Sequence, residues 1–130
     1  MTKEEKELLL QDLCARLPYG VKAYIEHDTF YDEIEPYDGT VNTNTINDLL
    51  HNEKLEVKPY LRPMSSMTRE EKAYWNYHRC MVGDGVFSLG YDNPIFCIFE
   101  CFEWLNSHHF DYGGLIEKGL ALEAPEGMYN

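Results

Sequence analysis

The apolar residues of this chain change their spacing at residues 18–20, from a helical period to a strand period. Before this point they recur at intervals of three and four residues, which predicts one buried face of a helix. These residues are Leu10, Leu13, Cys14 and Leu17. After it, apolar and polar residues alternate from Val21 to Ile25, as in a half-buried strand. Both periods so close together favour a domain that combines helices with a sheet.

Signals at both ends delimit the first helix. Thr2 and Glu5 have the spacing of a capping box, in which each side chain binds a free backbone N–H at the helix start. Pro18 and Gly20 are typical of a helix end. We therefore expect a helix between Thr2 and Pro18.

The next part of the chain predicts an antiparallel meander of three or four strands. A second extended run covers about 30–37, Asp38-Gly39 has the composition of a tight hairpin turn, and 40–46 is rich enough in Thr and Val to be the partner strand. Residues 53–58 follow as a further strand. Pro59 and Pro63 are expected to end it, because proline has no backbone N–H to donate.

The second half is predicted to be helical. Thr68 and Glu71 form another capping box. The helix that follows is expected to bury a stripe of Ala73, Tyr74, Tyr77 and Met81. Pro94 opens a second helix through about Ser107, residues 83–90 form a loop, and 111–130 form an irregular tail with a short ordered piece near 120–122. We expect one α+β domain over 1–130.

Charge narrows the possible partners. The chain has 23 acidic and 11 basic residues, a net charge of −12, and residues 23–53 hold eight acidic residues without Lys or Arg. Nucleic acid and anionic membranes are bound by clusters of cations, so neither is an expected partner. The excess of carboxylates serves solubility, or it forms an acidic face that docks on a basic protein partner.

The sequence also bears on the compartment. The first ten residues mix Lys with Glu and lack the apolar core of a secretory signal, and no apolar run is long enough for a membrane span. Four irregularly spaced Cys do not make a disulfide framework. We therefore expect a reduced, cytoplasmic protein.

Titratable residues are densest at the end of the helix that Pro94 opens. His108, His109 and Asp111 could serve a metal-dependent hydrolase, or the imidazoles could simply lie near the last carbonyls of the helix. Cys97 and Cys101 are expected to be small apolar core residues, since no second ligand pair stands at zinc spacing. No catalytic residue, metal or cofactor is assigned.

Recognition of a partner remains the leading hypothesis. The segment 58–63 combines two prolines with Tyr60 and Arg62, which suits recognition or a simple connection packed on the core. The candidate partner-binding residues are Asp32, Glu33, Glu35, Asp38, Tyr60, Arg62, His108, His109, Asp111 and Tyr112. A nucleotide-signal binding protein is the alternative, and it would need a tight oligomer with a basic pocket from Lys58, Arg62 and Arg69.

Three blocks of sequence are distinctive. They read LCARLPYGV (13–21), KPYLRPMSSMT (58–68) and WLNSHHFDY (104–112), the last followed by GLI (114–116) and GLALEAPEGMY (119–129). Together they resemble a family of small uncharacterised proteins carried by gut bacteria and by their phages and mobile elements. Gly113 stands where that pattern has Arg. The resemblance implies a bacterial or phage setting inside the cell, and it assigns no reaction. Function is therefore predicted as non-enzymatic binding of a protein partner.

Overall fold

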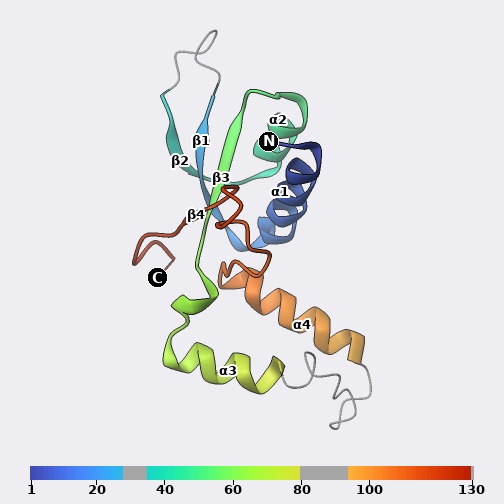
Figure 1. The fold of residues 1–130 in the computed structure, drawn as a ribbon, viewed down its shortest axis with the longest axis vertical. Coiled ribbons are helices and arrows are strands. Elements are labelled where there is room, and N and C mark those ends of the chain that lie inside the picture. Colours follow the sequence, from blue (N-terminus) through green and yellow to red (C-terminus); the bar gives the residue numbers. More distant parts are fainter. Residues whose placement is uncertain (28–34, 80–93, 130) are drawn as a thin grey trace.

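The computed structural model describes residues 1–27, 35–79 and 94–129 of the chain, and within these ranges the chain is an α+β protein (Figure 1). Its helices, strands and two short 3-10 helices (η) follow in chain order. They are α1 (Lys3–Arg16), η1 (Leu17–Tyr19), β1 (Lys22–Glu26), β2 (Tyr37–Thr40), α2 (Thr43–His51), β3 (Glu56–Leu61), η2 (Met64–Ser66), α3 (Arg69–Arg79), α4 (Pro94–Ser107) and β4 (Leu122–Glu123).

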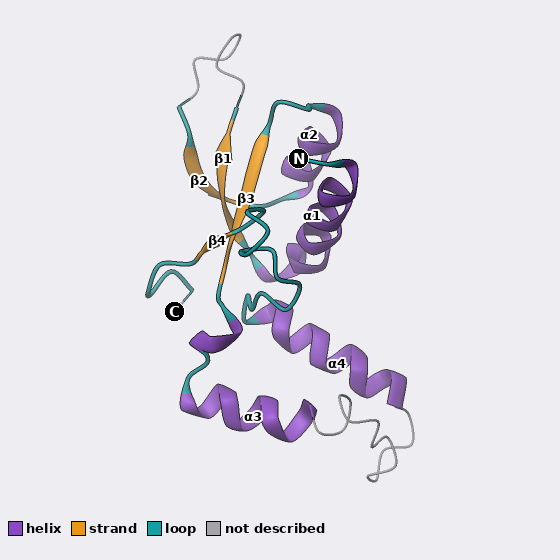
Figure 2. Cartoon of the chain, viewed as in Figure 1, coloured by secondary structure: helices purple, strands orange, loops and turns teal. Residues whose placement is uncertain are grey.

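The four strands form one mixed sheet in the order β2-β1-β3-β4 (Figure 2). β1 is antiparallel to both β2 and β3, whereas β4 runs parallel to β3, with Tyr60 opposite Leu122. The expectation of a purely antiparallel meander is therefore wrong. The chain makes the long excursion through α3 and α4 before it returns, and this leaves room for the crossover that a parallel pair requires.

One face of the sheet is covered by α1 and α2, and the core lies between them (Figure 1). The alternation expected along β1 is confirmed, because Ala23 and Ile25 are buried while Tyr24 and Glu26 are more exposed. The buried apolar cluster consists of Leu9, Leu13, Val21, Ala23, Ile25, Val41, Leu49, Leu55, Val57, Leu61, Leu115, Leu120 and Ala121. Since the last three come from the C-terminal segment, that segment completes the core rather than only wrapping the surface.

The capping box of α1 is confirmed, with Thr2 and Glu5 bonded reciprocally. Its buried face differs from the expected stripe: Cys14 is exposed, and the buried residues of the helix are Leu9, Asp12, Leu13 and Arg16. Asp12 and Arg16, four residues apart, neutralise each other inside the protein, which allows this side of the helix to be buried.

Asp38-Gly39 does not form the expected turn. Both residues lie within β2, where Asp38 is opposite Tyr24 and Gly39 is opposite Ala23. The strand expected over 40–46 is also wrong, because α2 begins at Thr43. The side chain of Asn42 accepts a hydrogen bond from the Thr45 N–H, and the Thr45 hydroxyl accepts one from the Asn42 N–H. This reciprocal cap favours a helix over the strand preference of Thr.

β3 continues through Pro59, although the proline was expected to end it. Pro59 lies opposite Ala23 of β1, and the neighbouring strand β4 first pairs at Tyr60. On the side away from β1, therefore, no described strand pairs with Pro59. A residue without an N–H can be accommodated at such a position, because the ladder loses little there.

The predicted helices of the second half are present, and they form an arm at one end of the sheet (Figure 1). The capping box of Thr68 and Glu71 is confirmed, as are the bounds of α4. The buried stripe expected on α3 is wrong at Ala73 and Tyr74, which are exposed. The other two stripe positions, 77 and 81, and the expected loop 83–90 fall outside the side chains or residues that the structure describes.

Candidate functional site

A buried ion pair on α1 binds the segment that follows the C-terminal end of α4. Arg16 is 0% exposed, and its Nε and Nη2 donate to the two carboxylate oxygens of Asp12 at 2.8 and 3.1 Å. Nη2 also donates to the Phe110 carbonyl at 2.6 Å. Burial raises the pKa of Asp12 even though Arg16 opposes that shift. A charge-assisted bond across 94 residues of sequence therefore holds the segment after α4 against α1.

A second arginine joins β3 to both helices of the arm. The Arg62 guanidinium lies over the Phe110 ring, 4.3 Å from its centroid, and makes a bidentate pair with Glu71 at 2.6 and 2.8 Å. This pair lowers the pKa of Glu71 to about 2. The backbone of Arg62 also bonds to His109 and Asp111 in a parallel bridge. Arg62 thus acts as a structural cation whose charge is already compensated.

The two adjacent histidines have different environments. His108 Nδ1 lies 3.0 Å from the Trp104 carbonyl, which confirms the interpretation of an imidazole near the last carbonyls of a helix. His109 has a positive φ of 62° and is only 6% exposed, and its ring stacks on Tyr129 with centroids 3.7 Å apart. α4 ends at Ser107, and the two imidazoles after it have different partners, so the rings do not converge on one ligand.

The remaining residue of the hydrolase hypothesis, Asp111, also has structural partners, as does the candidate partner-binding residue Tyr112. Both carboxylate oxygens of Asp111 accept backbone N–H bonds, from Leu115 and Ile116. The Tyr112 hydroxyl donates to Asn106 at 2.8 Å. Among the described residues, no three His, Cys, Asp or Glu side chains lie close enough to hold a metal ion. The geometry of the described residues therefore gives the hydrolase hypothesis no support.

The environment of His109 predicts a pH dependence of stability. Burial and the charge of Arg16 lower its pKa to about 4, from a usual value of 6.5. The unfolded chain therefore binds this proton more tightly, and the free energy of unfolding falls as the pH drops from about 6.5 to 4. We expect His109→Asn, which tolerates the positive φ, to flatten that slope in urea titrations. The same slope in both proteins would contradict this assignment.

Tyr129 ties the C-terminal segment to the end of the sheet. Its hydroxyl accepts from the Lys22 N–H at 2.9 Å and donates to the Tyr60 carbonyl at 2.7 Å, so it bridges β1 and β3. Burial raises the pKa of this hydroxyl to about 12. The phenol takes the place of a backbone pair at the point where the two strands stop pairing.

Removal of this hydroxyl should be measurable. We expect Tyr129→Phe to lower the free energy of unfolding by about 1–2 kcal/mol, because two backbone groups lose their partner. Urea denaturation followed by circular dichroism measures the change. Tyr19→Phe, a change on η1 for which no described hydrogen bond is lost, is the control and should stay within about 0.5 kcal/mol.

The acidic residues proposed for docking are only partly described. Asp32 and Glu33 lie outside the described residues, and Glu35 is exposed beside β2. Asp38 accepts a hydrogen bond of 2.7 Å from the Tyr60 hydroxyl across β1, and this bond raises the pKa of Tyr60. The structure thus brings two predicted residues together on the open face of the sheet, where they bond to each other.

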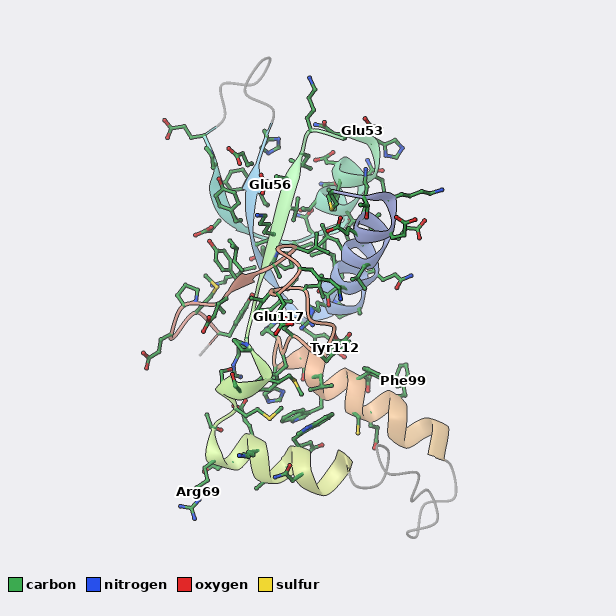
Figure 3. The ribbon with its side chains drawn as sticks, in the orientation of Figure 1. Glu53, Glu56, Arg69, Phe99, Tyr112 and Glu117 are labelled. Carbon is green, nitrogen blue, oxygen red and sulfur yellow. The ribbon has the colours of Figure 1, made fainter. Side chains whose placement is uncertain are left out.

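The basic pocket of the nucleotide hypothesis is not formed within one chain. Lys58 pairs with Glu56 at 3.1 Å and lines a groove beside α1. Arg62 is committed to Glu71 and lines a different pocket, of about 380 Å³, beside the C-terminal segment. Arg69 lies at the start of α3, with its side chain directed away from the sheet (Figure 3).

An aromatic and acidic surface on α4 is the most exposed apolar feature of the arm. Phe99 and Phe102 are 61% and 46% exposed, and they lie about 60° apart around the helix. Glu103, about 40° around the helix from Phe99, is also exposed. We call Phe99, Phe102 and Glu103 the α4 patch. Glu100 is exposed too, but it lies about 160° from Phe102, on the side of Trp104. Figure 3 shows Phe99 on the side of α4 away from α3.

The opposite side of α4 is already covered. Trp104 stacks on Tyr74 and Trp75 of α3, with ring centroids 4.8 and 6.2 Å apart. The Tyr112 ring packs edge-on against Phe102, with ring centroids 5.3 Å apart, at the C-terminal side of the patch. Cys101 is half-buried among these rings, in line with its expected role as a small apolar residue.

The Asp12–Arg16 ion pair, the α4 patch and the bridge made by Tyr129 were not predicted from the sequence. The first two nevertheless have a recognisable pattern in the sequence. Asp12 and Arg16 have opposite charges at a spacing of four, which is the spacing of a helical ion pair. Phe99 and Phe102 share a helix side with Glu103, a pattern that is unusual for a core helix. The role of Tyr129 follows from contacts distant in sequence and left no such signal.

The chain was compared with protein-family models, with curated proteins and with solved structures, and no match was found in any of the three. In the described part of the chain, none of the helices combines the length and apolar character that crossing a bilayer requires.

Proposed function

We propose that this chain is a non-enzymatic, acidic binding protein that docks on a protein partner through the α4 patch. Its setting is the cytoplasm of a bacterium or of a cell that carries the phage or mobile element encoding it. The single observation that carries the proposal is the exposure of Phe99 and Phe102 on a helix that projects from the sheet. Exposed aromatic side chains that lie together commonly mark protein interfaces.

The remaining chemistry of the described residues supports a binding role. Two polar groups near the end of α4 are already paired within the fold: Arg62 binds Glu71, and both carboxylate oxygens of Asp111 accept backbone N–H bonds. A net charge of −12 disfavours nucleic acid as the bound molecule. Phenylalanine rings bury large areas at low entropic cost, so two of them can supply the centre of a small interface.

Affinity capture with matched variants tests this proposal. The tagged chain is exposed to a lysate of the bacterium that carries it, in parallel with Phe99→Ser/Phe102→Ser and with the control Tyr37→Ser/Leu50→Ser. The control removes two other exposed apolar residues, on β2 and α2. We expect one dominant protein with the wild type and the control, and its loss with the α4 variant.

The same experiment separates the α4 patch from the acidic face first suggested by the sequence. Charge reversal at Glu35, with Asp32 and Glu33, should leave capture unchanged if α4 makes the contact. Loss of the partner in the charge-reversed chain alone would move the docking surface to the acidic segment. Capture that no variant alters would contradict both locations.

A further inference from the structure

We infer that the partner presents a basic amphipathic helix, which lays its apolar side on Phe99 and Phe102 and a cation on Glu103. This inference rests on the proposed function and adds the chemical class of the docking segment. It depends on three properties of the α4 patch: its shape, the sign of its charge, and the electrostatic cost of filling it with a second copy of the chain.

The shape of the patch favours a helix as the occupant. Phe99 and Phe102 belong to consecutive turns of a 14-residue helix and lie about 4.5 Å apart along its axis. Such a pair forms a short ridge rather than an open sheet edge. A ridge on one helix packs between the side chains of another helix, whereas an extended peptide pairs with a strand edge.

The charge of the patch is of one sign. Glu103 is exposed about 40° around the helix from Phe99, and the sequence has no Lys or Arg between Arg79 and Lys118. The two arginines at the root of α4 are unavailable, since Arg16 is buried against Asp12 and Arg62 is paired with Glu71. A cation on the partner would therefore meet a carboxylate that forms no ion pair with the described residues, which raises both specificity and the association rate.

The same charge disfavours a second copy of this chain as the occupant. Packing two α4 patches together would bring Glu103 of both copies to one interface. Each copy also carries a net charge of −12, so the two bodies repel each other before contact. Like charges that meet at an interface disfavour a complex, and here they disfavour the complex of two copies of this chain.

Labelled synthetic peptides test the inference on the whole chain. The first is an amphipathic helix of about five turns with Leu on one side and Lys and Arg on the other. The second has Glu in place of its cations, and the third is a scrambled form of the first without a helical stripe. Fluorescence anisotropy should show the first peptide binding at least about tenfold more tightly than the other two.

Variants of the chain locate that binding. Phe99→Ser/Phe102→Ser should weaken it by about tenfold or more, and Glu103→Gln by about threefold with a smaller dependence on salt. Tyr37→Ser/Leu50→Ser should leave it unchanged. Circular dichroism confirms that each variant is folded. Equal binding of the acidic or scrambled peptide, or binding that the α4 variant does not alter, would overturn the inference.

Two results distinguish this inference from the function on which it rests. If capture of a protein requires Phe99 and Phe102 while the three peptides are bound equally, docking through α4 stands and the proposed basic helix is wrong. If neither capture nor peptide binding depends on these rings, both fail. Sedimentation that shows a dimer lost in Phe99→Ser/Phe102→Ser would make a second copy the occupant, and would overturn the inference as well.

Discussion

Arg16→Met is expected to lower the free energy of unfolding by about 3–5 kcal/mol, the largest loss from a single charge in this chain. Methionine fills much of the same volume, but it leaves the Asp12 carboxylate buried without a partner. It also removes the donor that binds the Phe110 carbonyl. A buried charge or acceptor without a partner costs far more than an exposed one.

Urea denaturation at two pH values measures this loss and tests its cause. Burial already raises the pKa of Asp12 in the wild type. In Arg16→Met that carboxyl should take up a proton as the pH falls, so the deficit should shrink at acidic pH. Asp12→Leu/Arg16→Met leaves no buried charge and should be more stable than the single variant. A single variant within about 1 kcal/mol of wild type would contradict the buried pair.

Phe110→Ala is expected to cost about 3–5 kcal/mol as well, by a different mechanism. Phe110 is 0% exposed, and its ring contacts the Arg62 guanidinium on one side and the Trp104 ring, with centroids 5.6 Å apart. Alanine removes most of this contact and leaves a cavity at the point where β3, α3 and α4 meet. The cation–π contact of Arg62 is lost with it.

Denaturation of Phe110→Ala should be followed by both circular dichroism and tryptophan fluorescence. Trp104 should shift its emission in the folded variant, since it loses a neighbouring ring. Phe110→Leu, which keeps an apolar side chain in place, is the control and should lose clearly less stability. Equal losses for leucine and alanine would mean that the ring does not fill a packed site.

The local signals of the sequence predicted helix starts well. Thr2 with Glu5, Thr68 with Glu71, and Pro94 each mark a helix in the structure. These signals depend on two residues three positions apart or on one proline, so they act whatever the tertiary arrangement is. The hairpin at Asp38-Gly39 failed because the same dipeptide fits a strand, and its neighbours in the sheet decide between the two.

The site was harder to predict because its contacts join distant parts of the chain. Arg16 bonds to Phe110, and Tyr129 bonds to Lys22 and Tyr60. These residues are too far apart in the sequence for its periodicity to reveal the contacts. His109 was singled out for its chemistry, yet its ring packs against Tyr129 within the fold. A cluster of titratable residues in sequence is therefore a weaker guide than the hydrogen-bond partners of each member.

Hydroxyl-radical footprinting of the captured complex tests docking through α4 most directly, because it reports the solvent exposure of individual side chains. Phe99 and Phe102, 61% and 46% exposed in the free chain, should be oxidised several-fold more slowly in the complex. Tyr37, with a similar exposure of 45%, should keep its rate. Protection of Tyr37 with unchanged oxidation of Phe99 and Phe102 would contradict the account.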